Sequence, residues 1–136
     1  MLTLDPITET RESNGRAPSA FKLAILRHAR YSLGRNRQDL SRRELFRAVS
    51  LAVRDFLIDG MLATEARYER ADAKRLYYLS MEFLMGRSLG NNLINLGLFD
   101  LCRDALIELG ADLEEIRQME CDAALGNGGQ IGRAHV

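Results

Sequence analysis

Apolar residues recur every three or four positions along most of the chain, a spacing typical of helices that pack on a core. A first helix is predicted to begin at Pro18 and to end near Gly34, with four residues on its apolar face: Phe21, Ile25, Ala29 and Leu33. Ser41 and Glu44 have the spacing of a capping box, which predicts a long helix from there to about Arg67. Its apolar positions are expected to pack on a sheet: Phe46, Val49, Val53, Phe56, Leu57 and Met61.

The segment Leu76–Phe83 has a different pattern, because nearly all its residues are large and apolar. Such a run predicts a strand buried on both faces, as in a parallel sheet. After Gly86 the helical spacing returns at Leu89, Leu93 and Leu96, and the unit of strand, turn and helix predicts an α/β fold. One strand cannot pair its own backbone groups, so its partners are expected to lie outside this sequence.

Two more helices are predicted towards the end of the chain. One covers residues 98–109 and is ended by Gly110, and a short one follows Asp112, with Leu113 and Ile116 facing inward. Residues 120–125 then lead into a glycine-rich loop, Gly126–Gly129. Residues 1–17 have no apolar period and are predicted to form a flexible tail.

Composition narrows the classes of protein that fit. The 136 residues are 46% hydrophobic and 28% charged, as in one globular domain, and no apolar run is long enough to span a membrane. No secretory signal precedes the first helix, so a cytoplasmic location and no membrane partner are expected. The zero net charge is uneven, since residues 1–43 hold nine Lys or Arg against four Asp or Glu. These basic residues are spread out without interleaved aromatic rings, so no nucleic-acid partner is expected.

Few residues carry candidate chemistry. Gly126, Gly128 and Gly129 surround Asn127, a composition that allows backbone amides to approach a phosphate, although glycine-rich turns are more often plain turns. Glu82 lies in the predicted buried strand and needs a partner, for which Arg87 is the nearest cation, so a structural ion pair is expected.

Three other residues, His28, Cys102 and Cys121, lack the neighbours that a metal or catalytic site would require. His28 is expected to be structural, and both thiols are expected to be reduced, with Cys102 in the core. No metal site is predicted.

The strand segment and the glycine loop together carry a resemblance. YYLSMEFLMGRSLGNNLINLG, followed further along by ALGNGG, is similar to the amino-terminal part of the catalytic core of the glycogen (α-glucan) phosphorylases, over roughly residues 41–129. The resemblance implies a two-domain, GT-B-like glycosyltransferase fold, of which residues 18–129 are a truncated amino-terminal part, mostly helical with one central buried strand. The alternative is a free-standing helical interaction or nucleic-acid-binding module, in which YYLSMEFLM is a core helix.

The resemblance also implies an activity, the phosphorolysis of terminal α-1,4-glucosidic bonds to glucose 1-phosphate with pyridoxal 5′-phosphate. It places Gly128 and Gly129 against a cofactor or substrate phosphate, with Asn127 fixing the shape of the loop. The partners it implies are inorganic phosphate and a glucan (glycogen, starch or maltodextrin), with homodimerisation of the intact enzyme. Neither a catalytic residue nor the Schiff-base lysine is expected in this chain. The chain alone is therefore expected to be inactive.

The last seven residues depart from the family pattern, which continues Leu-Gly-Arg-Leu-Ala after GNGG. The chain instead reads QIGRAHV over residues 130–136. The codons CAG-ATC-GGA-AGA-GCA-CAC-GTC encode these residues and, from the second base, match a widely used sequencing adapter. Residues 130–136 are therefore predicted to be a non-native tail; the alternative is a one-residue insertion with a divergent helix.

Overall fold

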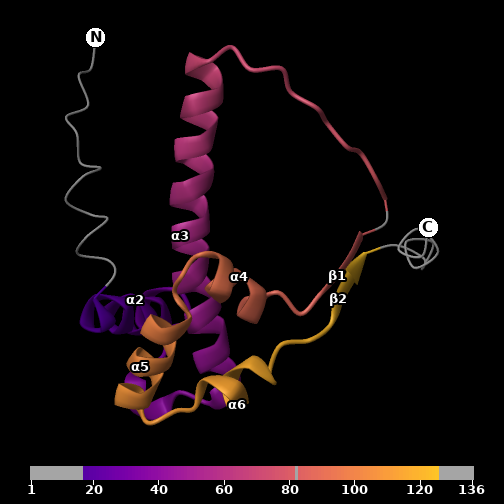
Figure 1. Cartoon of the computed structure of the whole chain (residues 1–136). Helices are drawn as coiled ribbons and strands as arrows, with labels where there is room; N and C mark the ends of the chain where they lie inside the picture. The colour runs from indigo at the N-terminus through magenta and orange to yellow at the C-terminus, as the bar shows by residue number, and fades with distance from the viewer. Residues whose placement is uncertain (1–16, 82, 126–136) are drawn as a thin grey trace.

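The computed structural model describes residues 17–81 and 83–125. In this part of the chain the elements follow in the order α2 (Pro18–Tyr31), η1 (Arg37–Asp39), α3 (Arg42–Arg70), β1 (Phe83–Gly86), α4 (Leu89–Asn95), α5 (Phe99–Leu109), α6 (Leu113–Arg117) and β2 (Ala123–Leu125). The described residues are therefore mostly helical, as predicted (Figure 1).

Local sequence signals set the ends of these helices. At the start of α3, Ser41 Oγ accepts from the Glu44 amide at 3.3 Å, and the Glu44 carboxylate accepts from the Ser41 amide at 2.9 Å, which confirms the capping box. Hydrogen bonds from the Ser41 hydroxyl and amide, together with Arg35, lower the pKa of Glu44 to about 2. Asp112 accepts from two amides of α6, and Gly110 ends α5 with a φ of 80°.

A helical body holds the core of the described residues. In it α2 packs against α3 and α5, and α6 packs against α3. The helix α4 packs against α5 and α3. The largest fully buried side chains come from all five α-helices of the described residues and from the loop before α5: Phe21, Ile25, Val49, Leu93, Leu98, Cys102, Leu106 and Ile116. Ion pairs between Lys22 and Glu108 and between Arg42 and Glu115 join the same helices at the surface.

The second half of α3 extends beyond the helical body (Figure 1). The first half of its apolar stripe, including Val49 and Val53, is buried in the body, whereas Leu57 and Met61 are exposed. The prediction that the whole stripe packs on a sheet is therefore wrong. The sheet seen in the described residues is a two-stranded ribbon, and Figure 1 shows it at a distance from α3.

The predicted strand lies elsewhere than expected. Residues 73–80 are neither helix nor strand, and Leu76 and Leu79 are 97% and 91% exposed. The strand instead begins at Phe83 and pairs antiparallel with β2, so a central buried strand over Leu76–Phe83 is wrong, and so is the alternative of a core helix there. A strand needs a partner for its amides and carbonyls, and within the described residues only the three residues of β2 supply one.

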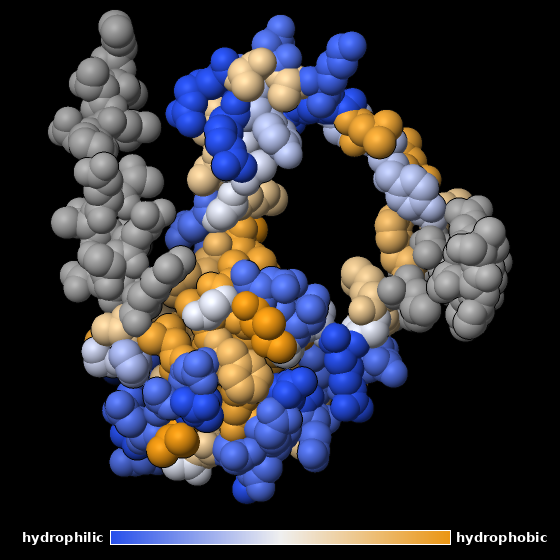
Figure 2. All heavy atoms as spheres, in the orientation of Figure 1, coloured by the Kyte–Doolittle hydropathy of each residue, from blue (hydrophilic) through white to orange (hydrophobic). Residues whose placement is uncertain are grey.

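We refer to residues 74–81 as the arm, because they connect the far end of α3 to the ribbon. Figure 2 shows apolar residues along the arm and on the neighbouring part of α3, with open space between them. The exposed apolar side chains of the arm are Leu76, Tyr77, Tyr78, Leu79 and Met81. The sequence of the arm is thus typical of a buried segment, yet its side chains are exposed.

Candidate functional site

The structure describes only part of the site expected from the sequence. Asn127, Gly128 and Gly129 lie outside the described residues, and so does Glu82. Arg87 is described and lies between β1 and α4. The phosphate role of the loop and the ion pair between Glu82 and Arg87 therefore stay predictions.

The ribbon of β1 and β2 joins the two segments that carry the family resemblance. Phe83 lies opposite Leu125, Leu84 opposite Ala124 and Gly86 opposite Ala123, with a shift in register between Leu84 and Gly86. Gly86 has a φ of 64°, which favours glycine at this irregularity. The glycine-rich loop follows directly after Leu125 in the sequence. The ribbon therefore pairs the residues directly before that loop with the strand motif.

The carboxylate of Glu120 binds the chain next to the end of the ribbon formed by Gly86 and Ala123, which we call the base of the ribbon. Glu120, three residues before β2, accepts a hydrogen bond from the Ser88 amide at 2.7 Å and from the Ser88 hydroxyl at 3.2 Å. It also accepts from the Leu89 amide at 3.1 and 3.2 Å. The Ser88 side chain makes no cap hydrogen bond at the start of α4, so Glu120 supplies the acceptor for these amides from a distant part of the sequence.

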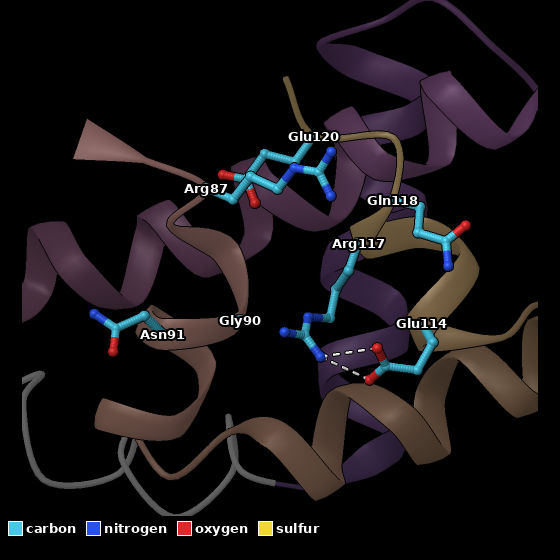
Figure 3. Close-up of a pocket in the computed structure, with 7 residues that line it drawn as sticks. All are labelled: Arg87, Gly90, Asn91, Glu114, Arg117, Gln118 and Glu120. Carbon is cyan, nitrogen blue, oxygen red and sulfur yellow. Dashed lines mark hydrogen bonds and ion pairs between the residues drawn. The ribbon is translucent and has the colours of Figure 1, made fainter. Parts of the chain in front are cut away.

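A pocket of about 130 Å³ lies beside this contact, lined by Arg87, Gly90, Asn91, Glu114, Arg117, Gln118 and Glu120. In Figure 3 the guanidinium of Arg117 points between Gly90 and Glu114. Arg117 Nη1 donates to both carboxylate oxygens of Glu114, at 2.7 and 2.9 Å. A Cβ on Gly90 would lie 2.6 Å from Arg117 Nη2, so only glycine leaves room for this side chain as placed.

The pocket offers little for acid or base chemistry. Its two carboxylates are already engaged, Glu114 by Arg117 and Glu120 by the start of α4. Two arginines and two glutamates also leave it without net charge, so it has no general attraction for an anion. We interpret the pocket as a structural junction between α4 and α6.

The described residues also include one histidine and two cysteines. His28 is buried between α2 and α3, with Nε2 2.9 Å from Asp55 Oδ2 and Nδ1 3.0 Å from Ser32 Oγ. Burial raises the pKa of the Cys102 thiol to about 12, so it is not a nucleophile at neutral pH, while Cys121 is an exposed free thiol.

Residues 17–81 and 83–125 contain no group of three or more His, Cys, Asp or Glu arranged to hold a metal ion. Within the same ranges, no helix is long and apolar enough to cross a membrane.

Comparison with known proteins connects the chain to a family. No protein-family model matches the chain. The brain form of glycogen phosphorylase from Bos taurus is 47% identical over 107 residues, which cover 79% of this chain and 13% of that protein. The glycogen phosphorylases of Chlamydia trachomatis and Chlamydia pneumoniae are 46% and 45% identical, over 84% and 90% of this chain and 14% and 15% of their own lengths. The chain is a fragment-sized relative of the glycogen phosphorylases.

This phosphorylase relative uses residues that its sequence pattern does not single out. Glu120 binds the start of α4 from about thirty residues further along the chain, and the guanidinium of Arg117 lies beside Gly90 of α4. No local signal marks Glu120, because its partners Ser88 and Leu89 lie far from it in the sequence, whereas Arg117 also pairs with Glu114 three residues before it. In the sequence, the charge of Glu120, three residues before β2, indicates only that the segment between α6 and β2 has a polar partner.

Proposed function

We propose that this chain is the amino-terminal part of the catalytic region of an α-glucan phosphorylase. The intact enzyme would phosphorolyse terminal α-1,4-glucosidic bonds of glycogen, starch or maltodextrin, transferring the glucosyl group to inorganic phosphate to give glucose 1-phosphate. The observation that supports this most is the pairing of β1 with β2, because it joins the strand motif to the glycine-rich loop. A cytoplasmic location and a homodimeric intact enzyme belong to the same proposal.

The fit of pyridoxal 5′-phosphate to this chain is partial. Successive glycine amides after Leu125 suit a phosphate group, and we assign that contact to Gly128 and Gly129, with Asn127 shaping the loop. The sequence contains two lysines, of which Lys22 is on α2 and donates to Glu108 at 2.8 Å. Neither lies in the loop segment, so the chain offers no cofactor-anchoring lysine there. We expect the chain alone to bind no Schiff-base cofactor and to be inactive.

The exposed arm supports the same proposal. An apolar segment that is typical of a buried strand requires strands on both sides. The relatives are about seven times longer than the aligned segment, which is enough chain to supply them. The basic residues near α2 give no support to the nucleic-acid alternative, because Lys22, Arg27 and Arg35 pair with acidic side chains of the same chain.

A chimera tests the proposal. Residues 41–129 of this chain would replace the matching segment of the Chlamydia trachomatis enzyme, and glucose 1-phosphate release from glycogen would be measured together with cofactor absorbance and a thermal melt. We expect a chimera that holds the cofactor and is active. In it Gly129→Ala should lower kcat/KM at least about tenfold, because a Cβ restricts the loop backbone and its close approach to the phosphate. Gly60→Ala, at a glycine with open space around it, should not. A chimera that melts cooperatively and holds the cofactor without releasing glucose 1-phosphate would overturn the proposal.

A further inference from the structure

The strongest unassigned feature of the described residues is the contact between Glu120 and the start of α4. One carboxylate takes three donors there: the amides of Ser88 and Leu89 and the Ser88 hydroxyl. Hydrogen bonds to an ionised acceptor are shorter and stronger than neutral ones, and a negative charge is favoured at the amino end of a helix. The contact therefore links two segments that lie far apart in the sequence.

The contact lies close to one end of both strands, where it can affect how they pair. Ser88 follows β1 by two residues, and Glu120 precedes β2 by three. The two strands are short and joined by few hydrogen bonds, and an isolated two-stranded ribbon of this kind is only marginally stable in water. A fixed point at its base removes the freedom of β2 to slide along β1. The glycine-rich loop follows β2 directly in the sequence.

We infer that Glu120 is a positioning residue that sets the register of β2 and thereby places the glycine-rich loop for a phosphate group. The inference rests on the proposed function for the meaning of the loop, but not for the effect on the ribbon. Glu120 touches no substrate in this account and acts only through β2. The neighbouring carboxylate Glu114 has no such role, because it binds Arg117 within α6.

Glu120→Ala and Glu114→Ala form a matched pair, since both remove a carboxylate from the same pocket. Nuclear magnetic resonance on the full 136-residue chain would follow amide exchange and the cross-strand contact between Phe83 and Leu125. We expect Glu120→Ala to speed exchange at Ser88 and Leu89 by about tenfold or more and to weaken the cross-strand contact. Amides of the helical body, such as that of Leu106, should be unchanged, and Glu114→Ala should leave the ribbon as it is.

Three outcomes decide the inference. If the cross-strand contact survives in Glu120→Ala, Glu120 does not set the register. If exchange rises equally in the ribbon and the helical body, Glu120 is a general stabilising residue and not a positioning one. Glu120→Gln keeps the shape and one acceptor oxygen, and it should restore the cross-strand contact in part.

Titration with inorganic phosphate, read at the amides of Gly128 and Gly129, separates this inference from the proposed function. We expect phosphate to change the amide chemical shifts of the wild-type chain, and we expect these changes to be severalfold smaller in Glu120→Ala. No shift in the wild-type chain would count against the phosphate role of the loop, while the exchange result would still decide the role of Glu120. Equal phosphate shifts in both proteins would overturn the link from Glu120 to the loop.

Discussion

Two leucines of this chain should respond to the same substitution in opposite ways. Leu106 on α5 is 0% exposed, and Leu79 in the arm is 91% exposed. Replacing a buried leucine with alanine removes apolar contacts and leaves a cavity, at a cost of about 2–5 kcal/mol. The same substitution at an exposed position away from special contacts changes stability by less than about 0.5 kcal/mol.

These magnitudes translate into melting temperatures. For a body of this size, 1 kcal/mol shifts the melting temperature by about 4–8 °C, so Leu106→Ala should melt about 8–40 °C lower than wild type. Leu79→Ala should stay within about 4 °C of the wild-type melting temperature. Circular dichroism at 222 nm, at a protein concentration low enough to prevent association, measures both. A loss of more than about 1 kcal/mol in Leu79→Ala would show that the arm is packed, and the reasoning about its missing strand partners would fail.

Three further predictions concern single features. The pKa of Glu44 is lowered from 4.5 to about 2 in the folded chain, so its contribution to stability is present above pH 4.5 and is lost as the pH falls towards 2; the gap in melting temperature between wild type and Glu44→Gln should close over that range. Cys121 should react with Ellman's reagent in the native chain, whereas Cys102 should react only after denaturation. Re-sequencing the source DNA should replace residues 130–136 with Leu-Gly-Arg and further coding sequence; recovering QIGRAHV followed by native sequence would refute the adapter explanation.

The helices were predictable because their signals are local. A capping box such as that of Ser41 and Glu44 needs only four residues, and a glycine such as Gly110 ends a helix through its own backbone freedom. The buried faces of α2 and α5 also follow from spacing alone, and Phe21 and Leu106 lie in the core as that spacing requires. Such features depend little on what the rest of the chain does.

The ribbon and its base were not predictable, because each depends on a partner that is distant in the sequence. β2 has only three residues, too few for a periodic pattern, and it is a strand only because β1 lies beside it. Glu120 likewise acquires its role from Ser88 and Leu89, which no spacing rule connects to it. The loop residues Asn127, Gly128 and Gly129 lie outside the described residues, so the sequence remains the sole basis for their assignment.

The arm links the fold to the proposed function. Its composition specifies a strand buried on both faces, but such a strand needs neighbouring strands, and in the described residues strand pairing begins only at Phe83. Local pattern and tertiary structure agree in the helical body and disagree in the arm, and sequences that fold well are consistent at both levels. The disagreement is resolved if the partners belong to other parts of a phosphorylase, since the matched relatives extend far beyond the segment that this chain covers. On this argument, supplying those parts in the chimera should bury Leu76 and Leu79, and Leu79→Ala should then become as costly as Leu106→Ala.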